Sequence, residues 1–242
     1  MMTAIQIPKL RKKALQGNVI AQCRLAEHLM FSKEPRLREA NKWLQMAADQ
    51  GNAWAQYSLA LNYEEGDGIR RDQKQAIRWY RLSAHQGFDS AQLNLGVCYG
   101  KGRGVIQNRK AALGWYRRAG RQQNKQACHN IGLYYDLGLG ISENQILAFR
   151  WYLKAARFGH VDSMLQTGYR YHEGEGVRPQ PKLAVVWYRK AARRGDKFAQ
   201  YNLGLCYQDG DGVGKSLTIA CQWFRRSAAQ GYRKAKAKIG ES

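Results

Sequence analysis

The sequence lacks any long apolar stretch. No run approaches the ~18 apolar residues that a membrane-spanning helix needs. The first residues, MMTAIQIPKLRKK, also lack the apolar core of a secretory signal. Provided that the chain begins at its native N-terminus, these two absences predict a cytoplasmic protein without a transmembrane segment.

Cysteines and acidic residues are also scarce. The five cysteines are scattered, with no CxxC pair and no spacing that recurs along the chain, which favours free thiols over a disulfide framework. Only 18 Asp and Glu stand against 40 Lys and Arg, so the formal net charge is +22. A charge of this size bears on partners and solubility rather than on the fold.

What the sequence does contain is a pattern that returns every 36 residues. The stretch AQYNLGLCYQDGDGV begins at Ala199, and related stretches begin at Ser163, Ala127, Ala91, Ala55 and, in a shorter copy, Ala21. Such a period predicts a solenoid, in which stacked units form one continuous domain. We expect a capping helix over residues 1–17 and a half-repeat helix over residues 232–242. Between them, the predicted repeats span residues 18–51, 52–87, 88–123, 124–159, 160–195 and 196–231.

Each repeat is predicted to form two helices. In the first segment, A, apolar residues such as Ala91, Leu95 and Tyr99 recur at helical spacing. Glycine inside a helix costs ~1 kcal/mol relative to alanine, so the recurrence of Gly96 in later copies predicts a second helix pressed against it. Segment A stops at a Gly-x-Gly pair, and segment B starts at an N-cap such as Asp72. The fold class predicted is therefore all-α.

The recurring pattern, A-x-x-x-L-G-x-x-Y-x-x-G-x-G-V and then A-x-x-W-Y-x-x-A-A-x-x-G, resembles the Sel-1-like repeat, a relative of the tetratricopeptide repeat. The resemblance covers about residues 18 to 240, with departures in the first loop and at Gln123, where the closing glycine is missing. It implies a right-handed α/α superhelix of antiparallel helix pairs and non-catalytic work as an adaptor or scaffold. Some secreted members with paired cysteines are linked to β-lactam binding, but this chain has neither their cysteines nor a Ser-x-x-Lys.

Catalytic and metal-binding patterns are weak. The segment GVGKS lacks the first glycine and the preceding strand of a phosphate loop. Acidic glycine turns such as Asp209-Gly-Asp211-Gly lack the later ligands of a calcium loop. The five histidines have no metal-ligand spacing, and no Gly-x-Ser-x-Gly is present. We therefore expect no enzyme activity, no cofactor and no metal; an active site assembled across repeats is the alternative.

A polar stripe on the A helices is the first candidate binding surface. The resemblance implies that A helices line a concave groove, where asparagine amides could donate to and accept from an extended peptide. The alternative is that they bond neighbouring turns. The residues predicted to contact a protein partner are Asn94, Lys101, Asn130, Tyr134, Gln166, Arg170, Glu173 and Asn202. Of these, Lys101, Tyr134, Arg170 and Glu173 break the repeat pattern and are the candidates for specificity.

A basic stripe on the B helices is the second candidate. Its members fall within about 100° of arc by the helical period. They are Arg117, Arg118, Arg121, Arg150, Lys154, Arg157, Arg189, Lys190, Arg193, Arg225 and Arg226. Arginine suits phosphate and carboxylate, so an anionic partner (nucleic acid, acidic protein or membrane head groups) is the alternative function. A solvated basic face is the other interpretation. The sequence names no partner and predicts no oligomeric state.

Overall fold

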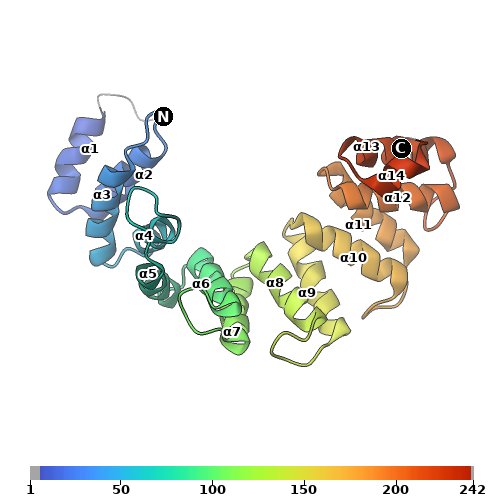
Figure 1. The fold of residues 1–242 in the computed structure, drawn as a ribbon, viewed down its shortest axis with the longest axis horizontal. Coiled ribbons are helices and arrows are strands. Elements are labelled where there is room, and N and C mark those ends of the chain that lie inside the picture. Colours follow the sequence, from blue (N-terminus) through green and yellow to red (C-terminus); the bar gives the residue numbers. More distant parts are fainter. Residues whose placement is uncertain (1–5, 241–242) are drawn as a thin grey trace. The chain divides into compact units, whose positions relative to one another are not determined.

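The structure is a computed structural model that describes residues 6–240 (Figure 1). This stretch contains helices and no strand, so the all-α prediction is confirmed. The helices are α1 (Gln6–Leu15), α2 (Val19–Met30), α3 (Leu37–Asp49), α4 (Ala53–Glu65), α5 (Gln73–His85), α6 (Asp89–Lys101), α7 (Arg109–Arg121), α8 (Lys125–Asp136), α9 (Gln145–Arg157), α10 (Val161–Glu173), α11 (Pro181–Arg193), α12 (Lys197–Asp209), α13 (Leu217–Ala229) and α14 (Arg233–Lys238).

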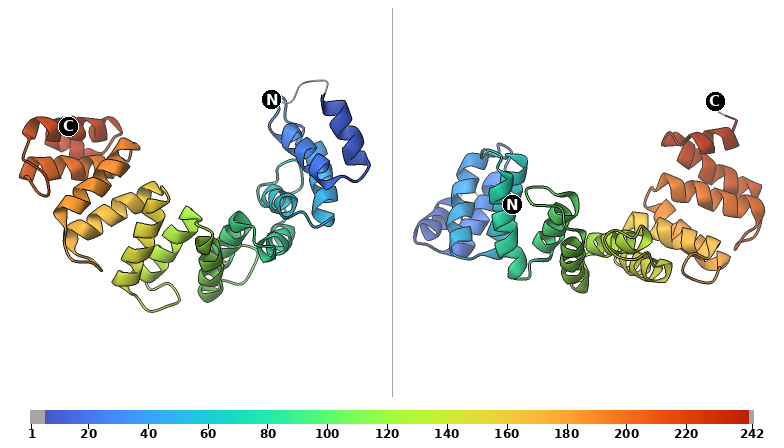
Figure 2. Two further views of the ribbon diagram at one scale, coloured as in Figure 1. Left: turned by 180° about the vertical axis from the view of Figure 1, so that it is seen from behind. Right: turned by 60° about the horizontal axis from the view of Figure 1, so that its bottom comes forward.

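The helices form two compact units, one ending at Gln122 and the other beginning at Gln123. In the first unit the A helices α2, α4 and α6 pair with the B helices α3, α5 and α7. In the second unit α8, α10 and α12 pair with α9, α11 and α13. Helix α1 packs on α2, and α14 packs on α13. The pairs follow one another within each unit in both figures, as in the predicted α/α solenoid (Figure 2).

Glycines bring helices A and B together. A Cβ built on Gly168 would lie 2.6 Å from the ring of Tyr188, and one on Gly132 would lie 2.8 Å from the ring of Tyr152. Gly96 and Gly204 face Tyr116 and Phe224 in the same way. The second aromatic residue of α7, α9, α11 and α13 therefore fills the space that the missing side chain leaves. The predicted close approach of a second helix is confirmed.

The helix ends follow local stereochemistry. The carboxylate of Asp72 accepts from the backbone N–H groups of Lys74 and Gln75, which caps α5. Helix α4 ends at Gly66, whose φ of 88° is left-handed. At Gln123, where the closing glycine is missing, φ is 66°, and no other non-glycine residue among residues 6–240 has a positive φ. A left-handed conformation costs a residue with a Cβ ~1–2 kcal/mol.

Candidate binding surfaces

The predicted A-helix stripe has members of unequal exposure. Lys101 and Glu173 are exposed. Half-buried members are Asn94, Asn130, Gln166 and Asn202. Tyr134 and Arg170 are buried, with exposed fractions of 6% and 2%. Burial leaves these two side chains little surface for a ligand, which counts against Tyr134 and Arg170 as direct contacts.

Arg170 joins helices instead of facing a partner. Its Nη2 lies 2.5 Å from Asp136 Oδ1, and its Nη1 donates to Gln145 Oε1 at 2.6 Å. Glu175 Oε2 lies 3.4 Å from Nη1, and the guanidinium lies 5.2 Å from the ring centroid of Tyr152. These partners come from α8, α9 and the loop after α10. Arg170 therefore holds the fourth repeat against the fifth.

Two asparagines of the stripe bond tyrosines of the B helices, whereas Asn130 accepts from Gln126 on its own helix. Asn94 Nδ2 donates to the hydroxyl of Tyr80 at 3.1 Å, and that hydroxyl donates to Glu64 Oε2 at 2.7 Å. Asn202 shares a hydrogen bond with the hydroxyl of Tyr188 in the second unit. Burial raises the pKa of both tyrosines, so both hydroxyls stay protonated at neutral pH. The interpretation in which these amides bond neighbouring helices accounts for Asn94 and Asn202.

A pocket of about 200 Å³ opens between the A helices α10 and α12. Its lining residues are Tyr169, His172, Glu173, Tyr188, Asn202, Leu205, Cys206, Asp209 and Asp211. The His172 imidazole contacts Glu173 Oε1 at 2.7 Å and Asp211 Oδ2 at 2.8 Å, and Tyr169 is 40% exposed. Two predicted stripe residues, Glu173 and Asn202, meet here. Tyr169 and Leu205 were missed because an apolar or aromatic residue on an A helix is typical of the core.

The first unit also has a pocket between consecutive A helices. It has a volume of about 270 Å³ and is lined by residues of α2 and α4, together with the cap residue of α4. The lining residues are Ile20, Cys23, Arg24, Glu27, Asn52 and Trp54. Ile20 is 64% exposed, so this pocket presents apolar surface to solvent. A small cavity on the A side is therefore present in both units.

The B helices from α5 onward carry charge of one sign. Helices α5, α7, α9, α11 and α13 contain no Asp or Glu, and each has two to five Lys or Arg. All members of the predicted basic stripe are exposed except Lys154 and Arg189, which are half-buried. Arg189 Nη2 donates to the hydroxyl of Tyr207 at 3.0 Å. Most of the predicted stripe is thus on the surface of its unit.

The repeated tryptophans support this basic stripe. Arg118 lies 4.3 Å from the ring centroid of Trp115, one helical turn earlier. The same arrangement recurs on α9, α11 and α13, at distances of 4.8, 4.1 and 4.6 Å. A cation over an indole face is attracted by the ring quadrupole while its charge stays in contact with water. The tryptophans therefore place cations on the B side, whereas the following Tyr or Phe fills the glycine gap.

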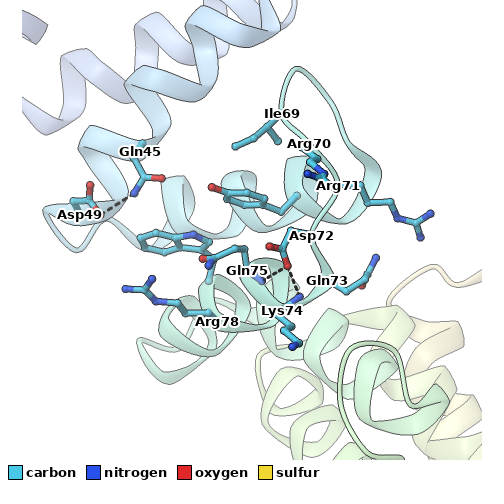
Figure 3. A pocket seen from close by; sticks show the side chains of 12 residues that line it. Gln45, Asp49, Ile69, Arg70, Arg71, Asp72, Gln73, Lys74, Gln75 and Arg78 are labelled. Atoms are coloured by element: carbon cyan, nitrogen blue, oxygen red, sulfur yellow. Dashed lines mark hydrogen bonds between the residues drawn. The ribbon is translucent and has the colours of Figure 1, made fainter.

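Figure 3 shows a pocket on the B side of the first unit, about 730 Å³ between α3, the α4–α5 loop and α5. Its lining includes four cations, Arg70, Arg71, Lys74 and Arg78, and two carboxylates, Asp49 and Asp72. Arg71 and Arg78 extend in opposite directions (Figure 3). Both carboxylates are used locally, because Asp49 accepts from Gln45 and Asp72 caps α5. The cations do not converge on one point.

Comparison with known proteins decides the family. The profile of the Sel1 repeat family matches residues 19–52, 55–88, 89–124, 125–160, 161–196 and 197–232. The chain belongs to the Sel1 repeat family. Sel1 repeat proteins are generally protein-interaction scaffolds and typically non-catalytic. A search of the curated proteins found no match.

Two solved Sel1 repeat structures resemble this one over most of its length. One is c5321, a protective antigen of uropathogenic Escherichia coli strains, with 35% identity over 97% of this chain and a TM-score of 0.93. The match covers 50% of c5321, so the chain spans about half the length of that protein. The other is a Sel1 repeat protein from Oxalobacter formigenes, with 31% identity, a TM-score of 0.81, and coverage of 91% of this chain and 88% of its own.

Two histidines of the second unit pack against each other between α8 and the start of α10. His129 and His160 are stacked with ring centroids 4.4 Å apart, and Ser163 Oγ lies 2.9 and 3.1 Å from their Nδ1 atoms. Burial, reinforced by His160, lowers the pKa of His129 to about 4. Burial also lowers the pKa of His160. The equivalent pairs in two other repeats are Tyr57 with Phe88 and Tyr201 with Tyr232.

Metal-ligand groups, cysteine thiols and membrane-spanning helices are further features on which a function could depend. Among residues 6–240 no group of three His, Cys, Asp or Glu side chains is arranged to hold a metal ion. The five cysteines are free, and burial raises the pKa of Cys98 and Cys206 to about 12. No helix in the described part of the chain is both long and apolar enough to span a bilayer.

Proposed function

We propose that this Sel1 repeat protein is a non-catalytic scaffold that binds an extended segment of a partner protein on its A-helix side. The observation that carries the proposal is the pocket between α10 and α12. Successive A helices contribute to it an exposed aromatic ring, Tyr169, a half-buried amide, Asn202, and an exposed carboxylate, Glu173. A small cavity with an apolar wall and a few polar groups is typical of a site that anchors one side chain of a ligand.

The lining chemistry suggests what the partner segment presents. Glu173, Asp209 and Asp211 place three carboxylates around the pocket, and the Tyr169 ring adds an exposed aromatic face. Carboxylates form charge-assisted hydrogen bonds with Lys and Arg, and an aromatic face attracts a cation. A segment with a Lys or Arg beside an apolar residue therefore fits this pocket better than an acidic segment.

Peptide selection tests the proposal without knowledge of the partner. A random peptide library is selected on the immobilised protein, and the enriched peptides are measured by fluorescence polarisation. We expect enrichment of Lys or Arg and weaker binding to the variant Tyr169→Ala/Glu173→Gln. The matched control is Glu143→Gln, an exposed carboxylate in the α8–α9 loop. Equal affinity of the selected peptides for all three proteins would count against the A-helix side.

The B-helix side supports a second candidate function, electrostatic binding of an anionic partner. The supporting observation is the absence of Asp and Glu from five B helices that are rich in exposed Lys and Arg. Binding that neutralises phosphates or sulfates weakens linearly in log[salt]. Retention on heparin should therefore fall steeply between low and moderate salt, and further in Arg225→Gln/Arg226→Gln. Retention that is independent of salt would remove this candidate.

A further inference from the structure

One pocket of the second unit is lined by cations without any carboxylate. It has a volume of about 420 Å³ and lies where α9, the α9–α10 turn, α10 and α11 meet. Its lining residues are Ala156, Arg157, Gly159, Met164, Trp187, Lys190, Arg193 and Arg194. None of the four cations forms an ion pair with another residue in the described range 6–240. Their charge is therefore available to a ligand.

Two residues that line this pocket stand where four of the six repeats have an internal hydrogen bond. In four repeats a glutamine just after helix B donates to a glutamine on helix A, at 2.7 to 3.0 Å. The pairs are Gln50 with Gln22, Gln86 with Gln56, Gln122 with Gln92, and Gln230 with Gln200. The fifth repeat has Arg194 and Met164 at these positions. A neutral amide pair is thus replaced by a guanidinium beside a thioether.

The Arg194 side chain is held in place but keeps donors free. Its Nη1 donates to the carbonyl oxygen of Gly159 at 2.9 Å and lies 3.8 Å from Met164 Sδ. A guanidinium has five N–H donors in a rigid fork, and one of its nitrogens is used here. Arg194 is itself exposed, so its remaining N–H groups are open to an incoming acceptor.

The residues contributed by α9 and α11 add to the positive electrostatic potential in the pocket. Trp187 is 8% exposed and carries the Lys190 ammonium over its ring at 4.1 Å. Arg157 and Arg193 add two further exposed cations. Cations around a concave surface with a low-dielectric wall concentrate positive potential more than the same charges spread over a flat surface. A small ligand with more than one negative charge gains most from such a pocket.

We propose that this pocket binds a phosphate monoester. A monoester carries a charge of about −1.5 to −2 at pH 7 and three acceptor oxygens, which suit several Arg and Lys donors in one place. A phosphodiester carries one charge per phosphate and depends on a long basic track instead. The proposal rests on the anionic-partner function suggested for the B-helix side, and it assigns to that side one pocket and one ligand class.

Isothermal titration calorimetry with three probes tests the assignment. The probes are a short phosphoserine peptide, the same peptide without phosphate, and a nucleoside monophosphate. The variant Arg194→Gln/Met164→Gln introduces the glutamine pair that four other repeats have, so its fold should be retained, which circular dichroism checks. The matched control is Arg178→Gln, which removes one exposed cation in the α10–α11 loop of the same unit, outside both the pocket and the basic stripe.

We expect both phosphate monoesters to bind the wild-type protein and the unphosphorylated peptide not to bind. Loss of charge-assisted hydrogen bonds in the double variant should weaken monoester binding about tenfold or more, with Arg178→Gln close to wild type. Equal affinity for the two monoesters identifies phosphate as the recognised group, and preference for the phosphopeptide identifies a protein as its source. Either result supports the proposal.

Two results would overturn it: no binding of either monoester to the wild type, or equal monoester affinity of the wild type and the double variant. Heparin retention separates this failure from that of the broader function. If retention stays salt-dependent while monoesters do not bind, the pocket assignment fails and the basic side remains a binding surface. If monoesters bind through Arg194 and heparin is not retained, the pocket stands and the extended surface fails.

Discussion

The same substitution, glycine to alanine inside a helix, should have opposite effects at two positions. Gly168 on α10 faces the buried ring of Tyr188, and an added Cβ would lie 2.6 Å from that ring. Gly114 on α7 is exposed and has no atom within 4 Å of such a Cβ. Alanine gains ~1 kcal/mol of helix propensity at either site. Only Gly168→Ala also meets a steric penalty.

The structure sets the size of that penalty. An extra methyl in a packed core costs ~1–3 kcal/mol, because the neighbouring side chain or backbone must shift. Gly114→Ala should therefore raise the free energy of unfolding by about 1 kcal/mol. Gly168→Ala should lower it by about 0–2 kcal/mol, which leaves a difference of about 1–3 kcal/mol between the variants. This difference is free of the propensity contribution, since both variants share it.

Urea unfolding followed by circular dichroism measures both variants, with attention to whether the slope m stays constant. Ala60 occupies the equivalent position in the second repeat, so a methyl is tolerated where the neighbouring residues have adapted to it. The Gly168–Tyr188 pair has no such adaptation. If Gly168→Ala stabilised the protein as much as Gly114→Ala, glycine would not be what allows Tyr188 to pack against α10.

Three further changes have defined expected outcomes. Gln123→Gly should raise the free energy of unfolding by about 1 kcal/mol, because glycine adopts the φ of 66° without strain. Acidification from pH 6.5 to pH 4 should destabilise the second unit. The pKa of His129 is about 4 in the folded protein and 6.5 in the unfolded chain. The unfolded chain therefore binds the proton first as the pH falls, which favours unfolding. Arg170→Met should lower the free energy of unfolding by about 3 kcal/mol, since it leaves Asp136 without its buried partner.

Each of these outcomes has its own control. The pH effect should shrink in His129→Leu/His160→Asn, which installs residues that other repeats hold at these positions; an unchanged pH profile would assign the loss to other groups. Lys101→Ala, at an exposed site, should change stability by less than about 0.5 kcal/mol, in contrast to Arg170→Met. For Gln123→Gly, an unaltered urea midpoint would show that the left-handed backbone there is not strained.

Local stereochemistry explains why so much of the fold could be predicted. Gly66 lies in a left-handed turn, Asp72 caps a helix, and Gly168 lies at a close helix contact. Each of these local structures favours one residue type, which therefore recurs at a fixed position of the repeat. The all-α architecture follows from these residues and from helical periodicity. The exposure of the basic stripe was predictable for a different reason: burying an unpaired charge is costly, so Lys and Arg on a B helix are expected at the surface.

What only the tertiary structure decided is which polar residues remain accessible. The A helices are covered on most sides, so a helical wheel could not tell that Arg170 and Tyr134 are buried while Tyr169 is exposed. Arg170 is tolerated inside because Asp136, Gln145 and Glu175 reach it from other helices and loops, across 5 to 34 residues of sequence. Periodicity reports the conformation of one segment, whereas burial depends on what neighbouring segments place against it.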